Sequence, residues 1–243
     1  MQKFLIPGGS IRENRVILDG SDARHITRVL RLSRGDHLSL TDGMGTDFSG
    51  RITDCNREQV TVEIMDTRLS QTESPLVLTV CTGMLKYQKM DDVIQGLTQI
   101  GITRWIPFFC ERSIPLPDAK ALDRRMERWQ TIANETIKQC QRSRVVEISF
   151  PMTFDRILAM AKDFDHCIAF WEQGGDSLSQ LMPGKGRNQT LVLIGPEGGF
   201  SESEINRASA SGFIPYSLGP RILRAETASL CGAALIQHRL GDM

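Results

Sequence analysis

The 243-residue sequence has no excess of charge of either sign, because 29 lysines and arginines balance 29 aspartates and glutamates. A chain without a global positive field does not attract nucleic acid over its whole surface, so any contact with RNA must be a local patch. The sequence also lacks an apolar run of the ~18–20 residues that a membrane-spanning helix requires. Its first residues have no long apolar core of the kind found in a signal peptide. We therefore expect a cytoplasmic protein with no membrane partner.

Several common catalytic and redox motifs are missing as well. The six cysteines are far apart and form no CxxC pair, which indicates reduced thiols. No histidine and cysteine cluster has zinc spacing and HExxH is absent, so we expect no metal. The sequence contains no GxxxxGK[ST] phosphate loop, no GxGxxG fingerprint after the first strand of its α/β part, and no GxSxG nucleophile elbow. Phosphate-loop, dinucleotide-binding and serine-hydrolase chemistry therefore have no anchor in the sequence.

The first 72 residues have the pattern of a small antiparallel β structure. Short segments of alternating polarity are separated by turn signals such as Gly8-Gly9 and Asp42-Gly43. Several short strands at this spacing favour a small barrel. Strands are expected over residues 16–18, 37–40, 48–53 and 60–64, with one helix over residues 21–32.

An arginine stripe is expected on the helix over residues 21–32. Arg24, Arg28 and Arg31 are spaced i, i+4 and i+7, so three guanidiniums would share one helical face. Arginine forks match phosphate oxygens, and such a stripe can bind RNA without reading its sequence. A merely solvated helix face is the alternative. The lack of any acid between positions 22 and 36 leaves the two interpretations even.

A polar segment that ends in Pro75 separates this part from the rest, which gives domains 1–72 and 73–243. Beyond it, apolar strand-like runs alternate with helical periods, a succession that predicts a mostly parallel sheet with helices on both faces. Strands are expected over residues 76–81, 105–109, 145–148, 167–170, 191–194 and 214–218. Helices are expected over residues 86–100, 119–141 and 154–161, from Ser201 onward, and up to Arg239.

The long helix ends in a cluster of cations: Lys138, Arg142 and Arg144. Cations at the carboxyl end of a helix complement its macrodipole, which is a structural role. A contact with a phosphate or with RNA is the functional alternative, and the sequence leaves both open. Two loops that follow strands, residues 171–175 and 184–186, are candidates to close over a ligand.

Two turns rich in glycine and proline stand between a predicted strand and a predicted helix. The first, residues 195–199, is followed by Ser201 and Glu204 at the spacing of a capping box. The second begins at Leu218-Gly219 and leads into the last helix. In an α/β sheet such turns meet at the carboxyl ends of the strands, where ligands bind. Glycine lets a ligand approach the backbone closely, so these loops can read an adenine edge and ribose hydroxyls.

The same two turns carry a specific resemblance. LVLIGPEGGFSESE (191–204) and LGPRILRAETA (218–228) resemble the signature motifs of the RsmE family, SPOUT-class methyltransferases that act on small-subunit ribosomal RNA. Further segments are similar to the family: HITRVLRLSRGDHLSLTDG (25–43), KMDDVIQGLTQIG (89–101), RWIPFFCERS (104–113) and RWQTIANETIKQCQRSRV (128–145). The family pattern is departed from at Gln99, Gln141 and Val146.

The resemblance implies an α/β protein with a C-terminal SPOUT trefoil-knot methyltransferase domain and a small N-terminal PUA-like β-barrel. It implies a homodimer, with the last helix as an interface element, that uses S-adenosyl-L-methionine to methylate N3 of a uridine in 16S ribosomal RNA. The expected partner is 16S rRNA or the small ribosomal subunit. The cofactor-binding residues it implies are Ile194, Gly195, Pro196, Glu197, Gly198, Leu218, Gly219, Ile222, Leu223, Thr227 and Ala228.

Arg224 is the candidate catalytic residue. N3 of uracil is nucleophilic only after it loses its proton, and a cation near O2 or O4 stabilises the resulting anion. A salt bridge from Arg224 to Glu226 or Glu197 is the structural alternative. Glu197 either shapes the first loop, the role we favour, or holds a cofactor hydroxyl; no general base is evident. The RNA-binding candidates are Arg24, Arg28, Arg31, Arg142 and Arg144.

Three other functions are compatible with parts of the sequence. A related SPOUT methyltransferase would act on another RNA, and a ribosome-associated RNA-binding protein would have lost catalysis. The intact segments 195–199 and 224–227 speak against the loss of catalysis, because a pure RNA-binding protein does not need a cofactor pocket. A dinucleotide-dependent oxidoreductase comes third, since its phosphate-binding fingerprint is absent.

Overall fold

The computed structural model describes residues 3–86, 88–113, 118–182 and 188–243. The chain divides into two compact units. One consists of Met1–Glu73 and Asn134–Val145, and the other of Ser74–Ala133 and Val146–Met243. This division differs from the two consecutive domains expected from the sequence, because Asn134–Val145 packs with the N-terminal strands.

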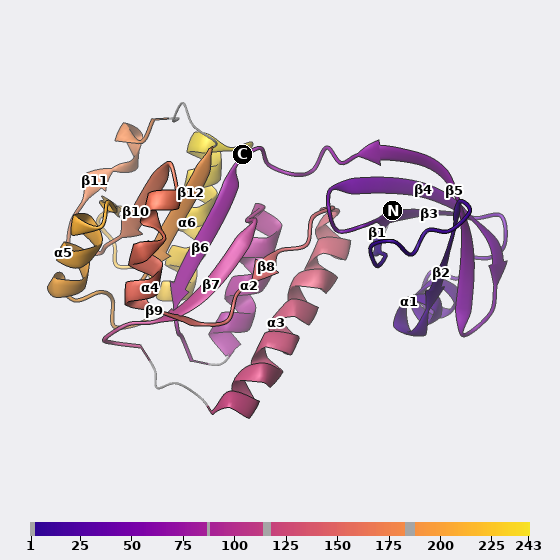
Figure 1. The fold of residues 1–243 in the computed structure, drawn as a ribbon, viewed down its shortest axis with the longest axis horizontal. Helices are drawn as coiled ribbons and strands as arrows, with labels where there is room; N and C mark the ends of the chain where they lie inside the picture. The colour runs from indigo at the N-terminus through magenta and orange to yellow at the C-terminus, as the bar shows by residue number, and fades with distance from the viewer. Residues whose placement is uncertain (1–2, 87, 114–117, 183–187) are drawn as a thin grey trace. The chain divides into compact units, whose positions relative to one another are not determined.

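The N-terminal unit is built on a five-stranded sheet of order β1-β3-β4-β5-β2 (Figure 1). β1 runs parallel to β3, and the other pairs are antiparallel. Alternate residues such as Leu38, Leu40 and Val62 bury one apolar core. The four predicted strands are confirmed, and only the three-residue β1 was missed. The strands are β1 (Lys3–Leu5), β2 (Arg15–Asp19), β3 (His37–Thr41), β4 (Thr46–Cys55) and β5 (Gln59–Leu69).

The helix predicted over residues 21–32 is shorter and differently wound. α1 covers Gly20–Arg24 and continues as one π-helical turn, His25–Val29, in which Leu30 N–H donates to the carbonyl of His25 at 3.0 Å. Arg31 then has a φ of 55°, outside any right-handed helix. The prediction of three arginines on one α-helical face is therefore wrong, because the π turn changes the angular spacing of the side chains.

Buried polar contacts fix Asn134–Val145 within the N-terminal unit. Lys3 Nζ donates to Asp47 Oδ1 at 2.8 Å and to the carbonyl of Gln141 and the hydroxyl of Ser143 at 2.7 Å each. Arg142 is only 4 % exposed, and its Nη2 lies 2.8 Å from Glu73 Oε2. Buried charges are tolerated only when they are paired and hydrogen-bonded, and this network meets that requirement.

The C-terminal unit contains a parallel sheet of order β11-β13-β10-β12-β6-β7-β8, with β9 paired to β7 (Figure 1). The strands are β6 (Val77–Gly83), β7 (Arg104–Phe109), β8 (Glu147–Ile148), β9 (Met152–Thr153), β10 (His166–Phe170), β11 (Asp176–Ser177), β12 (Gln189–Ile194) and β13 (Ile214–Ser217). The α-helices are α2 (Gln88–Ile100), α3 (Ala119–Cys140), α4 (Phe154–Ala159), α5 (Glu202–Ala210) and α6 (Ala225–Leu240). From Asn134 onward, α3 belongs to the N-terminal unit. The predicted α/β succession is confirmed.

Both faces of this sheet are covered, as the sequence predicts. Val80, Val192 and Ile168 point to a core that α2 and α6 also line, whereas Cys81 and Leu193 point to a second core lined by α4 and α5. Strands that are buried on both faces consist of nearly continuous apolar residues, so their positions can be predicted from the sequence.

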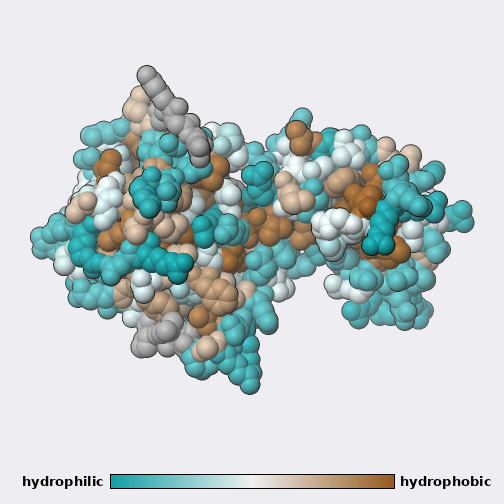
Figure 2. Space-filling model, in the orientation of Figure 1, coloured by the Kyte–Doolittle hydropathy of each residue, from teal (hydrophilic) through white to brown (hydrophobic). Residues whose placement is uncertain are grey.

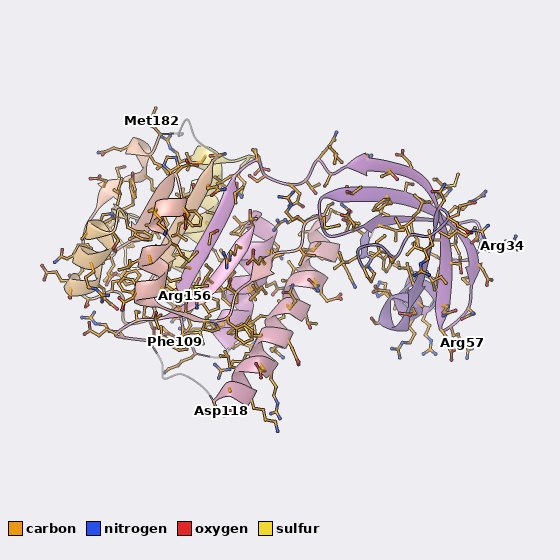
Figure 3. All side chains as sticks on the ribbon, in the orientation of Figure 1. Arg34, Arg57, Phe109, Asp118, Arg156 and Met182 are labelled. Carbon is orange, nitrogen blue, oxygen red and sulfur yellow. The ribbon has the colours of Figure 1, made fainter. Side chains whose placement is uncertain are left out.

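On the face drawn in Figure 2, hydrophilic residues cover most of the surface of each unit, and apolar residues are scattered among them. Arg34 and Arg57 of the N-terminal unit are exposed, as the stick view shows (Figure 3). Within the described ranges, no helix combines the length and apolar character needed to cross a membrane.

Candidate functional site

The first glycine-rich loop joins β12 to α5 and is held at its far end by a capping box. The Ser201 hydroxyl accepts from Glu204 N–H at 3.2 Å, and Ser201 N–H donates to the Glu204 carboxylate at 2.9 Å. The predicted capping box is confirmed. Glu204 also accepts from Glu111 N–H at 2.8 Å, and Arg112 Nη1 donates to the carbonyl of Gly198 at 2.9 Å. The segment after β7 therefore braces this loop.

Glycine is required where this loop touches its neighbours. A Cβ on Gly83, near the end of β6, would lie 2.6 Å from Pro196 N and 3.0 Å from the carbonyl carbon of Gly195. A Cβ on Gly199 would collide with the Glu172 carboxylate, and Gly199 has a φ of 64°. The backbones therefore approach more closely than any side chain would allow.

The second loop joins β13 to α6. Gly219 has a φ of 102°, and its N–H donates to the Ser217 hydroxyl at 3.1 Å. Arg224 is the N-cap residue of α6, and its carbonyl accepts from Ala228 N–H at 2.8 Å. A guanidinium carries only N–H donors and cannot cap the N–H groups at the start of a helix, and the Arg224 side chain makes no capping hydrogen bond.

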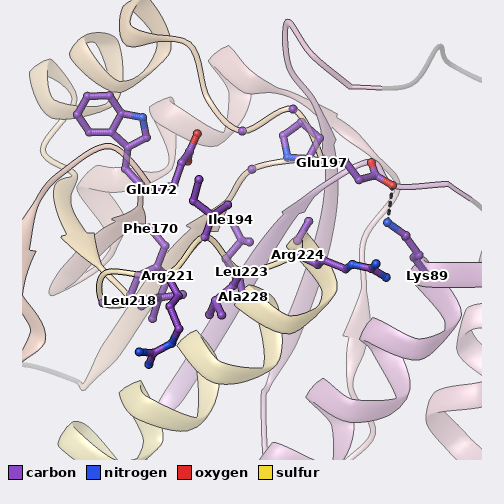
Figure 4. A pocket seen from close by; sticks show the side chains of 18 residues that line it. Lys89, Phe170, Glu172, Ile194, Glu197, Leu218, Arg221, Leu223, Arg224 and Ala228 are labelled. Atoms are coloured by element: carbon purple, nitrogen blue, oxygen red, sulfur yellow. Dashed lines mark ion pairs between the residues drawn. The ribbon is translucent and has the colours of Figure 1, made fainter.

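These two loops and the segment after β10 enclose a cavity of about 380 Å³ (Figure 4). Its size lies within the range of roughly 300–1,000 Å³ that is typical of small-molecule sites. Backbone of the glycine-rich loops and apolar side chains such as Ile194 and Leu223 form much of the wall. The lining residues are Lys89, Phe170, Trp171, Glu172, Ile194, Gly195, Pro196, Glu197, Gly198, Gly199, Leu218, Gly219, Arg221, Ile222, Leu223, Arg224, Ala225 and Ala228.

The structure brings together Arg224 and all of the predicted cofactor-binding residues except Thr227. Thr227 is exposed and does not line the cavity, because it lies on a different side of α6 from its neighbour Ala228. Some lining residues were not predicted although they lie inside the two signature motifs. They are Gly199, Arg221 and Ala225.

Other lining residues come from distant segments of the chain. Some of these lie in a loop that the sequence already marked as a ligand-closing candidate because it follows a predicted strand. Trp171 and Glu172 belong to the predicted loop 171–175, which follows β10. Lys89 lies in α2, at the start of the family-like segment 89–101, but it was not predicted to line the cofactor cavity. The other candidate loop, residues 184–186, lies outside the described residues.

One lysine organises the acidic side of the cavity. Lys89 Nζ lies 3.1 Å from Glu197 Oε1 and 3.3 Å from Glu226 Oε2 (Figure 4 shows the first pair). The hydrogen bond to Glu197, followed by the one to Glu226, raises the pKa of Lys89 despite partial desolvation. Desolvation alone would raise the pKa of Glu197, but hydrogen bonds from Lys89 and from backbone N–H groups, including that of Lys86, lower it overall. The pair is therefore ionised near neutral pH.

Arg224 is not the partner of these acids, so the salt bridge considered from the sequence is not formed. Among the described residues no carboxylate forms an ion pair with Arg224 or Arg221, and both side chains are exposed. The two arginines leave the second loop in different directions (Figure 4). Both guanidiniums are available to an anionic ligand.

Trp171 lines the cavity, and its side chain also packs against the second core of the sheet, the one lined by α4 and α5. Its Nε1 is buried and has no hydrogen-bond partner within the described chain.

The five RNA-binding candidates divide by exposure. Arg24, Arg28, Arg31 and Arg144 are exposed. Arg142 is buried against Glu73, so the prediction that its guanidinium contacts RNA is corrected: the charge holds the N-terminal unit together. Nowhere in the described residues do three or more histidine, cysteine or acidic side chains gather as a metal-binding group.

Comparison with known proteins gives consistent matches over nearly the whole chain. A model of an RNA methyltransferase domain matches residues 72–237, and one of an RNA methyltransferase PUA domain matches residues 18–65. Ribosomal RNA small subunit methyltransferase E of Buchnera aphidicola subsp. Schizaphis graminum is 31% identical over 234 residues, which is 95% of this chain and 93% of that protein. Its counterpart in Bacillus subtilis is 28% identical over 228 residues, 91% of this chain and 89% of that protein.

Two solved structures are similar in fold. Ribosomal RNA small subunit methyltransferase E from Neisseria gonorrhoeae, bound to S-adenosyl methionine, has a TM-score of 0.90 at 28% identity and covers 100% of this chain and 99% of its own. A putative methyltransferase from Legionella pneumophila with bound SAM has a TM-score of 0.88 at 28% identity, with 99% and 98% covered.

Proposed function

We propose, from the premise that this chain belongs to the RNA methyltransferase family, that it methylates N3 of a uridine in 16S ribosomal RNA. Its relatives are named as methyltransferases of small-subunit ribosomal RNA, and the chain itself is an S-adenosylmethionine-dependent ribosomal RNA methyltransferase. The observation that carries the proposal is the cavity between the two signature loops, which collects every predicted cofactor residue except Thr227.

The residues of the cavity fit S-adenosylmethionine. Glycine-rich backbone and the apolar side chains of Ile194, Leu218 and Leu223 suit an adenine ring, whose edge is read by backbone donors and acceptors. The exposed cations at the mouth suit the carboxylate of the methionine part or a phosphate of the RNA. When bound, the cofactor supplies a methyl group that its sulfonium already activates toward a nucleophile.

The protein then has two tasks, to align the reacting groups and to stabilise charge. Uracil N3 becomes a nucleophile only as it loses its proton, and the negative charge spreads to O2 and O4. Arg224 is the proposed catalytic residue, because its guanidinium is exposed at the cavity and unpaired with any described carboxylate. The proton passes to water or to a group of the RNA. We assign no side chain as general base.

We further propose that the protein acts as a cytoplasmic homodimer with the SPOUT trefoil knot. β10 lies between β12 and β13, so the connection between the latter two crosses over it, and α6 returns beside β12 and β6. Ile222 is 84% exposed and Leu235 is 41% exposed, which suits coverage by a second copy. Leu230 and Ala233 of α6 pack within the chain: Leu230 lies against Gly96, and Ala233 is buried.

RNA binding is proposed for the exposed arginines of the N-terminal unit and for Arg144. The double substitution Arg28→Glu, Arg31→Glu should weaken binding to 16S rRNA, most strongly at low salt, and leave the affinity for S-adenosylmethionine within twofold. If both affinities fall together, the proposed division of labour between the units is wrong.

The deciding experiment is mass spectrometry of 16S rRNA nucleosides from cells that lack the gene and carry wild-type, Arg224→Ala or no replacement copy. We expect 3-methyluridine to disappear with the gene, to return with the wild type, and to stay low with Arg224→Ala. Isothermal titration should then show that Arg224→Ala binds S-adenosylmethionine within threefold of the wild type. Unchanged 3-methyluridine in the deletion strain would refute the uridine target; a ribosome-associated binding role would follow if no other RNA lost a methyl group.

A further inference from the structure

Lys89 belongs to the first turn of α2, yet it contacts both parts of the cofactor cavity. Its ammonium bridges Glu197 in the first loop and Glu226 in the first turn of α6, directly after the second loop. The Glu197 carboxylate also accepts from Lys86 N–H at 3.4 Å. A single cation thus joins three segments that are far apart in the sequence.

The two helices that flank this cation form a tight pair. A Cβ on Gly96 of α2 would lie 2.5 Å from Leu230 Cδ2 of α6, so the helices approach at the limit that glycine allows. Val93 and Leu97 of α2 share a core with Ile236 of α6. The pair is therefore a firm base, and Lys89 is the charged contact that ties the first loop to it.

Glu226 shows how much depends on this lysine. Its Oε2 is buried, and among the described residues the ammonium of Lys89 is the group that compensates its charge. A buried carboxylate oxygen that loses its cation must find water or move. Without Lys89, two carboxylates that now lie on either side of one nitrogen would repel each other.

We propose that Lys89 is a positioning residue that sets the two cofactor loops in register, by holding Glu197 and Glu226 on one ammonium. The inference rests on the proposed function, since it gives the lysine a role in binding S-adenosylmethionine. Lys89 acts on the loops and not on the reacting atoms. It also explains the role of Glu197, whose carboxylate shapes the loop.

The size of the effect follows from the exposure of the pairs. The side chains of Lys89, Glu197 and Glu226 are 31%, 32% and 22% exposed, so water screens the ion pairs in part. Two such pairs and the release of one loop should together weaken cofactor binding about tenfold. The turnover of bound cofactor should change much less, because the chemistry does not pass through Lys89.

The test compares Lys89→Met with Lys89→Arg in the full-length protein, with Lys162→Met as the matched control. Lys162 is exposed in the same unit and does not line the cavity. Titration calorimetry should give a dissociation constant for S-adenosylmethionine about tenfold higher for Lys89→Met, and within threefold of wild type for Lys89→Arg and Lys162→Met. In a Glu197→Gln background, Lys89→Met should weaken binding only about threefold, because the ion pair with Glu197 is already lost and the pair with Glu226 remains.

Two results would overturn the proposal. One is wild-type affinity in Lys89→Met, whatever happens to its melting temperature, since a merely structural lysine would change stability alone. The other is the same tenfold loss in the Glu197→Gln background as in the wild type, which would show that the two residues act independently. A wild-type protein that fails to bind S-adenosylmethionine would instead contradict the proposed function.

Discussion

The close contact between β6 and the first cofactor loop makes Gly83→Ala a stringent test of the site. The added methyl group would lie 2.6 Å from Pro196 N and 2.7 Å from Pro196 Cδ. Ordinary contacts begin near 3.4 Å, so the loop must move by about 0.8 Å. Neither side can yield by rotating a side chain, because the obstructing atoms belong to backbone and a proline ring. β6 is itself held by pairing with β12 and β7 on both sides.

The expected cost is measurable in both stability and binding. Overpacking of this kind typically costs about 1–3 kcal/mol of unfolding free energy, which corresponds to roughly 2–12 °C in melting temperature for a chain of this size. A displacement approaching 1 Å at a site that aligns reactants can cost up to about 100-fold in rate. We expect at least a tenfold loss in the affinity for S-adenosylmethionine by calorimetry, and a larger loss in the rate of RNA methylation.

Gly174→Ala is the matched control. A Cβ on Gly174 would lie 3.7 Å from the Trp171 ring, an ordinary contact, and the residue does not line the cavity. This variant should keep the melting temperature and the affinity of the wild type. If Gly83→Ala also kept both, the first loop would not be held where the structure places it, and the steric argument for the site would fail.

Two further predictions concern residues away from the cavity. Arg142→Ala should lower the unfolding free energy measured in urea by about 3–5 kcal/mol, because it leaves the Glu73 carboxylate without its cation. Arg144→Ala, at the surface, should change the unfolding free energy by less than about 0.5 kcal/mol. Equal effects of the two substitutions would contradict the buried ion pair. Burial raises the pKa of Cys110 to about 11, so a thiol reagent at pH 8 should leave this residue largely unmodified in the folded protein. Peptide mass spectrometry after timed quenching checks this, and rapid labelling of Cys110 at pH 8 would refute it.

The regular elements were largely predictable because each depends on local periodicity. The long helix expected over residues 119–141 is α3, Ala119–Cys140, and the strand expected over residues 191–194 is β12, Gln189–Ile194. The family resemblance and the α/β fold with a PUA-like N-terminal unit are confirmed by the matched domain models and by the solved relatives. The π-helical turn after Arg24 was not predicted, because no periodicity in the sequence distinguishes it from an α-helix.

Contacts between distant segments could not be predicted in the same way. Arg142 looked like a surface cation because its partner, Glu73, is 69 residues away. Lys89 looked like one charge among many until the fold placed it beside Glu197 and Glu226. The motif residues of the cavity were predictable because they are contiguous, whereas the side chains that hold the motifs in place come from other elements.

Contacts from distant segments hold the first cofactor loop in place before a ligand binds. The first loop is rich in glycine and would be mobile alone, yet it is restrained from three directions: by Lys89 at Glu197, by Arg112 at the carbonyl of Gly198, and by the capping box at Ser201. A loop that is already ordered loses little conformational entropy when a ligand arrives. Affinity for the cofactor should therefore depend on residues outside the two signature motifs, such as Lys89 and Arg112, almost as strongly as on those motifs themselves.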